Sequence, residues 1–173
     1  SDEIIADVTF ADGADIITAS AGTSNFRAGV NAGNSIASGG NYNVVVGDEA
    51  GTAITTGDNN VAVGYQALDA NTTADHNTAV GANALTANTT GAHNSALGYQ
   101  ALVTNTTGGF NVATGGAALQ LNTTGTNNVA SGYGALYSNT TASNNSSFGY
   151  KALFANTTGN QNVAVGANAL DAN

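Results

Sequence analysis

Histidine offers the most versatile side-chain chemistry in this sequence, and it occurs twice, at His76 and His93. The two residues are 17 positions apart and Asp75 precedes the first, so a metal site has to be considered. A structural zinc site uses four ligands in a tetrahedral arrangement. The residues at further steps of 17 are Phe110, Asn127, Asn144 and Gln161, which do not complete such a set. We therefore predict no metal site and no cofactor.

Other catalytic groupings are missing from the sequence. There is no cysteine, so there is neither a thiol nucleophile nor a disulfide framework. No paired carboxylates recur at a fixed spacing, no Ser-His-Asp grouping is indicated, and the glycines lack the strand-to-helix setting of a phosphate loop. Calcium-binding G-G-x-G-x-D repeats are also absent. We predict that the chain is not an enzyme and has no catalytic residue.

Four tyrosines form a candidate binding or interface surface. Tyr65, Tyr99, Tyr133 and Tyr150 each follow a glycine and are separated by multiples of 17 residues. Exposed tyrosines in a row stack on sugars or pack against another chain. We favour packing against a neighbouring copy, with host-surface glycans as the alternative partner. The column before the glycines is also variable and mostly apolar, and it contains Val63, Val80, Leu97, Thr114, Ser131, Phe148 and Val165.

Asn-Thr-Thr triplets recur in step with these residues. Each triplet matches the N-glycosylation sequon, but a motif in strict register is explained by turn geometry, with asparagines stacked and hydrogen-bonded from one repeat to the next. The first threonines form a row of the kind that binds ice. Since the adjacent threonine points to the opposite side of an extended chain, a single file is expected. The triplets begin at Asn71, Asn88, Asn105, Asn122, Asn139 and Asn156, and the row contains Thr72, Thr89, Thr106, Thr123, Thr140 and Thr157.

A 17-residue repeat positions all of these side chains. The consensus is N-x-A-x-G-x-x-A-L-x-x-N-T-T-G-x-x, without insertion or deletion from residue 43 onward, and a looser copy covers residues 25–42. This gives about nine coils. The glycines that mark the repeat are Gly47, Gly64, Gly81, Gly98, Gly115, Gly132, Gly149 and Gly166.

The repeat predicts short strands. Glycine, the Asn-Thr-Thr run and a second asparagine in each unit disfavour a helix. Residues 60–64 alternate as a strand does, and residues 67–73 are predicted as a second strand, so two strands and two turns make one coil. The column that begins at Ala62 is always small, and those that begin at Ala67 and Leu68 do not vary; all three are predicted as the core, because a narrow interior admits small side chains and one leucine per coil. We predict an all-β protein, a β-solenoid or β-roll roughly 40 Å long at a spacing of about 4.8 Å per coil.

Charge and chain organisation limit the partners. The net charge of −9, with two basic residues, Arg27 and Lys151, excludes nucleic acid as a partner. No apolar run is long enough for membrane insertion. Residues 1–24 are an atypical N-terminal cap or junction with two short predicted strands at 7–10 and 15–18, and residues 25–173 are the repeat body. Because the last repeat is incomplete, we expect that the polypeptide continues or that another chain docks there.

The unit N-T-A-V-G-A-N-A-L-T-A-N-T-T-G at residues 77–91 resembles repeats of phage tail fibres, notably of marine phages, and of related bacterial surface proteins. The resemblance covers residues 25–173. The N-x-A-x-G core is also similar to the head repeat of trimeric autotransporter adhesins, which has a shorter period and forms parallel β-rolls in a homotrimer. The resemblance implies a trimeric extracellular fibre, on a virion or cell surface, that attaches to a host. No segment matches the self-cleaving chaperone domain of such fibres, so no catalytic residue is carried over.

These observations predict a structural or adhesive fibre segment, formed by a parallel homotrimer and used for attachment. One alternative is the subunit of an extracellular filament that assembles end to end, because unpaired strand edges recruit further strands. A second alternative is an ice-binding solenoid that uses the threonine row.

Overall fold

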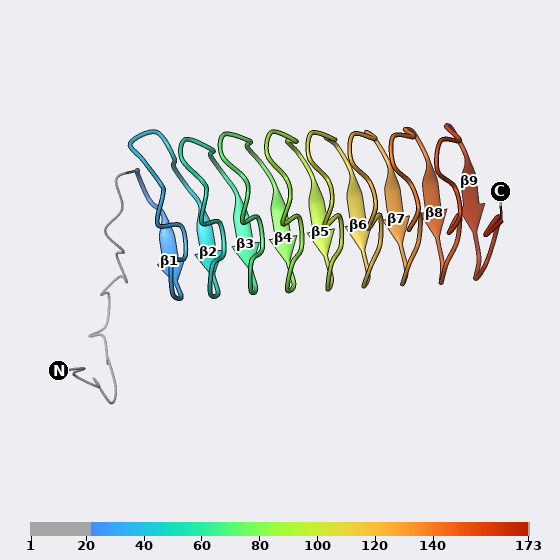
Figure 1. The fold of residues 1–173 in the computed structure, drawn as a ribbon, viewed down its shortest axis with the longest axis horizontal. Coiled ribbons are helices and arrows are strands. Elements are labelled where there is room, and N and C mark those ends of the chain that lie inside the picture. The colour runs from blue at the N-terminus through green and yellow to red at the C-terminus, as the bar shows by residue number, and fades with distance from the viewer. Residues whose placement is uncertain (1–21, 173) are drawn as a thin grey trace, which may run out of the picture.

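The computed structural model describes residues 22–172, which form a β-solenoid (Figure 1). Each coil contributes one short strand to a single parallel sheet, and the strands follow one another across the sheet in sequence order. The described residues contain no helix. The strands are β1 (Phe26–Ala28), β2 (Val44–Val46), β3 (Val61–Val63), β4 (Thr78–Val80), β5 (Ser95–Leu97), β6 (Val112–Thr114), β7 (Val129–Ser131), β8 (Ser146–Phe148) and β9 (Val163–Val165). The predicted all-β solenoid is confirmed.

The pairing register follows the 17-residue repeat. Val61 pairs with Thr78, Ala62 pairs with Ala79, and the same offset continues to β9. The β1 and β2 strands pair with an offset of 18, as in Phe26 with Val44, which absorbs the one extra residue of the looser first copy. The predicted match between residues 25–42 and the later repeats is therefore confirmed. The predicted strands at 7–10 and 15–18, and most of the predicted cap, lie outside the described residues.

The second half of each coil consists of turns, so the second strand predicted at residues 67–73 is wrong. The cause lies in the backbone of Gln66 and Leu68, each with a φ of 53°, which belongs to the left-handed region and bends the chain out of an extended path. This segment is still bound to the following coil, since the Leu68 N–H donates to the Ala84 carbonyl at 3.1 Å. One strand and a series of turns therefore make one coil.

The core contains the three predicted columns. Ala62, Ala67 and Leu68 are each 0% exposed, and most of their equivalents in the other coils are too. Successive side chains of a strand point to opposite faces of the sheet. In each three-residue strand the middle residue therefore points inward and its two neighbours point outward. A left-handed backbone costs a residue with a side chain about 1–2 kcal/mol. Full burial of a leucine side chain contributes about 1.5–3 kcal/mol, which offsets that cost.

The first two coils fill the same interior with a different pair of residues. Gly51 occupies the left-handed position that Leu68 occupies in the next coil, with a φ of 55°. Ile54 stands where Asn71 stands in the next coil, and it is fully buried. A Cβ added to Gly51 would lie 2.8 Å from the Ile54 Cδ1 atom, so the isoleucine fills the space that the leucine fills elsewhere. The first coil repeats this exchange with Gly33 and Ile36.

Two ladders of buried asparagines close the coils from residue 60 onward. The Asn77 N–H donates to Asn60 Oδ1 at 2.9 Å, and Asn77 Nδ2 donates to the Gly91 carbonyl at 2.9 Å. From the other side, Asn88 Nδ2 donates to Asn71 Oδ1 at 3.1 Å and to the same Gly91 carbonyl at 2.9 Å. The predicted stacking of the Asn71 column is confirmed. The two ladders converge on one carbonyl, which explains why both asparagines recur in every complete repeat from residue 60 onward: loss of either leaves buried polar groups unpaired.

The glycine after each strand is required by close approach between coils. Gly115 has a φ of 127°, and a Cβ built on it would lie 2.7 Å from the Gly132 carbonyl oxygen. Residues with a side chain rarely adopt this backbone conformation, and the neighbouring carbonyl occupies the space that the side chain needs. This column is invariant because the backbones of adjacent coils touch there.

Candidate binding surface

The four predicted tyrosines lie on the turn that follows their strands, and we call this column the tyrosine edge. Tyr65, Tyr99, Tyr133 and Tyr150 are between 50% and 59% exposed. Tyr133 and Tyr150 come from adjacent coils and stack, with ring centroids 5.9 Å apart and an interplanar angle of 15°. Tyr65 and Tyr99 are two coils apart, with Ala82 between them. The structure therefore brings the last two tyrosines together and leaves the first two separate.

The backbone fixes the position of these rings. The Tyr133 carbonyl accepts a hydrogen bond from the Lys151 N–H at 2.9 Å, and the Tyr99 carbonyl accepts one from the Ala117 N–H at 2.9 Å. Each tyrosine is thus tied through its own carbonyl to the next coil, so neighbouring rings are held at the spacing between coils. This arrangement supplies rigid aromatic surfaces and needs no ordering of a loop.

A second pair of aromatic rings lies near Tyr150. Tyr137 and Phe154 stack with centroids 4.9 Å apart, and Lys151 Nζ lies 5.0 Å from the Phe154 centroid and 5.4 Å from the Tyr150 centroid. Lysine above ring faces at these distances makes a cation–π interaction. We call Tyr133, Tyr137, Tyr150, Lys151 and Phe154 the aromatic cluster. The patterns described above for the sequence do not single out this cluster, although the 17-residue spacing of Tyr137 and Phe154 is a signal for the second stack.

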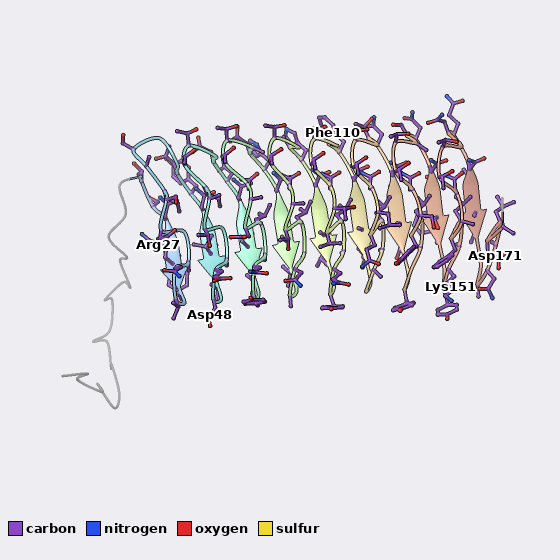
Figure 2. The ribbon with its side chains drawn as sticks, viewed as in Figure 1. Arg27, Asp48, Phe110, Lys151 and Asp171 are labelled. Carbon is purple, nitrogen blue, oxygen red and sulfur yellow. The ribbon has the colours of Figure 1, made fainter. Side chains whose placement is uncertain are left out.

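The two histidines stack as the sequence predicted. His76 and His93 have ring centroids 4.8 Å apart with an interplanar angle of 9°, and Phe110 continues the stack at 4.9 Å from His93. We call this column the histidine edge. Figure 2 shows Phe110 and Lys151 at opposite margins of the rod, so the histidine edge and the aromatic cluster are separate surfaces. Within residues 22–172, no group of three or more His, Cys, Asp or Glu side chains is placed to hold a metal ion.

Beside the histidine edge, side-chain oxygens accept hydrogen bonds from the backbone of the preceding coil. The Asn41 N–H donates to Asp58 Oδ1 at 2.6 Å, and the Asp58 N–H donates to Asp75 Oδ1 at 2.7 Å. The next residue of this column is Ala92, which has no side-chain oxygen, so the series stops at Asp75. The column resumes further along, where the Thr126 N–H donates to Ser143 Oγ at 3.0 Å. These carboxylates and hydroxyls therefore have a structural role.

The outer surface of the sheet is uncharged. It consists of the first and third residue of every strand, and we call it the sheet face. None of these residues in β1 to β9 is Asp, Glu, Lys or Arg. Several are large, apolar and partly exposed, among them Leu97 at 42% and Phe148 at 43%. The sheet face thus extends an uncharged surface along the whole described rod.

The Asn-Thr-Thr triplets are used inside the fold. Asn88 is fully buried, and its amide nitrogen, the atom to which a glycan is attached, donates the two hydrogen bonds of its ladder. The Thr89 hydroxyl donates to the Thr106 carbonyl at 3.0 Å, and the equivalent threonines of several other coils do the same. Thr90, the second threonine, is exposed. The second threonines of the triplets therefore form an exposed file, whereas the predicted row of first threonines is half-buried except at Thr157.

Comparison with protein-family models, with curated proteins and with solved structures gives no match to this chain. The part of the chain that the structure describes contains no helix of the length and apolar character that a membrane span requires. The surfaces that can contact a partner are the tyrosine edge with its aromatic cluster, the histidine edge and the sheet face.

Proposed function

We propose that this chain is a structural and adhesive segment of an extracellular fibre that attaches to a host or surface. The observation that carries the proposal is the alignment of two surface features along one rigid rod: the uncharged sheet face and the tyrosine edge. Both are built from the same positions of successive coils, so their side chains stand in register. Parallel arrangement of many weak contacts raises the overall affinity through effective concentration.

The sheet face supports self-association into a parallel homotrimer. Its nine strands extend about 38 Å along the rod at roughly 4.8 Å per strand, and three residues give a width of about 10 Å. The resulting area of about 380 Å² is below the roughly 800 Å² per partner of a stable interface. A flanking column must therefore contribute, either the histidine edge, which precedes the strands, or the tyrosine edge, which follows them.

Light scattering over a dilution series tests this proposal. A stable mass of three chains is the expected result. Open-ended growth on concentration would favour the end-to-end filament subunit instead, and a monomer at all concentrations would refute association through the sheet face.

Two charge insertions identify the contact. Leu97→Lys places a charge on the sheet face, and Tyr99→Lys places one on the tyrosine edge of the same coil. We expect Leu97→Lys to dissociate the trimer, because a buried unpaired charge is costly at an interface. If Tyr99→Lys also dissociates it, the tyrosine edge completes the interface. If Tyr99→Lys leaves it intact, the tyrosines are free to bind a ligand.

A further inference from the structure

The aromatic cluster contains the one charged residue in a long stretch of the chain. Between residues 76 and 170, Lys151 is the sole Asp, Glu, Lys or Arg. Within the described residues its ammonium group lies over the rings of Tyr150 and Phe154 and forms no ion pair. In a chain with a net charge of −9, this cation is placed where carboxylates are scarce.

The nearest acidic residues do not neutralise the site. Asp69 lies in the same column as Phe154 but five coils before it, about 24 Å away at the inter-strand spacing, which exceeds the Debye length of about 8 Å at physiological ionic strength. Asp171 is closer, since it follows Phe154 in the same column, and it is exposed. Asp171 forms no ion pair with Lys151 within residues 22–172. The local potential at the cluster is therefore set by the ammonium group, weakened by one solvated carboxylate.

From these features we propose that the aromatic cluster binds an acidic saccharide, a pyranose that carries a carboxylate. Tyr133 and Tyr150 stack on each other, so the exposed ring edges and the outer face of Tyr133, which lies next to Gly116, offer apolar surface to the C–H face of a sugar. Lys151 supplies a charge-assisted hydrogen bond to the carboxylate. This ligand class extends the attachment role proposed above and depends on it for its biological meaning.

The turn that contains Tyr133 leaves the site uncovered. Gly134 occupies the position that holds Gln66 and Gln100 in other coils. A Cβ added to Gly134 would lie 3.4 Å from Phe154 Cε2 and 3.5 Å from Lys151 Cγ. A glutamine side chain at this position would lie against the lysine and the ring. The glycine leaves both accessible from the side of the preceding coil.

The alternative is that the cluster is surface packing, in which the lysine stabilises the rings through cation–π contacts. The two interpretations differ in what they require of a ligand. Packing predicts no difference between an acidic and a neutral sugar. A carboxylate-binding site predicts selective binding that weakens with salt, because the charge pair is exposed.

The experiment is calorimetric titration of the full chain with a tetrasaccharide of galacturonic acid, with the neutral tetrasaccharide of galactose as the comparison. The repeat itself supplies conservative variants. Lys151→Gln introduces the residue found at Gln66 and Gln100, which have the same left-handed backbone, and Tyr150→Ala introduces the residue found at Ala82 in its column. Tyr65→Ala is the control, because Tyr65 is equally exposed but has no stacked partner and no lysine.

We expect the acidic tetrasaccharide to bind at least about tenfold more tightly than the neutral one, and each cluster variant to lose about tenfold in affinity. Tyr65→Ala should change the affinity less than about twofold. Equal binding of both sugars, wild-type affinity of Lys151→Gln, or no binding of the acidic sugar would overturn the inference. The mass of the same samples, measured by light scattering, keeps this result separate from the trimer: if the unmodified chain forms a trimer but does not bind the acidic sugar, the result counts against the saccharide site alone.

Discussion

Replacement of one of two adjacent glycines by alanine tests the account of how the coils stack. Gly115 and Gly116 are consecutive residues of one coil, so they share the same repeat and the same neighbours along the rod. The Gly115 Cβ would lie 2.7 Å from the Gly132 carbonyl oxygen at a φ of 127°. The Gly116 Cβ would lie no closer than 3.5 Å to any atom, the nearest being Tyr133 Cδ2, and its φ is not in the left-handed range. The two substitutions add the same methyl group to very different surroundings.

The expected cost of Gly115→Ala has two parts. The strained backbone contributes about 1–3 kcal/mol. Displacement of the Gly132 peptide by the added Cβ contributes about 1–3 kcal/mol more, as overpacking does in a core. We therefore expect a loss of about 2–6 kcal/mol of unfolding free energy, against a total of about 5–15 kcal/mol for typical domains. Gly116→Ala should stay within about 0.5 kcal/mol or stabilise by up to about 1 kcal/mol, because alanine reduces the entropy of the unfolded chain.

Urea unfolding followed by circular dichroism measures both free energies. Since each coil contacts its neighbours alone, a weakened coil can also open locally, and amide hydrogen exchange of residues 111–131 detects this. If the two variants differ by less than about 0.5 kcal/mol, close backbone approach is not the reason for the glycine column. Loss of protection confined to distant coils would likewise contradict the account.

Three further substitutions test other layers of the fold. Asn105→Ala should cost about 2–4 kcal/mol in urea unfolding, because it leaves buried ladder partners unpaired, whereas the exposed Thr107→Ala should change stability by less than about 0.5 kcal/mol. Leu119→Ala should cost about 2–5 kcal/mol and lower the thermal midpoint, and a near-neutral result would show that the interior collapses around the cavity. Ala92→Asn should stabilise by about 1 kcal/mol, because the new side-chain oxygen accepts a hydrogen bond from the Asp75 N–H, and a decrease in the midpoint would refute that continuation of the ladder.

The columns of the repeat made the core predictable. Ala62 and Leu68 are predicted in the interior because, from residue 60 onward, the first column contains only alanine and serine and the second only leucine, and both residues are fully buried. The stacking of His76 on His93 followed from the spacing alone. Equivalent residues in a stack of identical coils must lie above one another, so any column is a set of spatial neighbours.

The features that were not predicted depend on backbone conformation and on compensation between positions. The second strand at residues 67–73 does not form because Gln66 and Leu68 adopt a left-handed φ that tertiary packing stabilises, and the residue types at these positions do not reveal that conformation. Gly51 and Ile54 differ from the leucine and asparagine that the repeat has at these positions, and both differences are visible in the sequence. That the isoleucine side chain fills the space of the missing leucine is visible only in the structure. The aromatic cluster combines Phe154 with residues of other columns, and single columns do not reveal such combinations.

From β2 onward the offset between paired strands is constant, so the length of this rod can change without a change of fold. Removal or duplication of one 17-residue unit, such as residues 94–110, joins two strands that already share the same register and the same carbonyl contacts. Such a change alters the length of the rod by about 4.8 Å and leaves the backbone of every remaining coil in an equivalent environment. Unequal recombination between repeats therefore produces folded chains of graded reach, and the distance between the two ends can be selected independently of the surfaces along the sides.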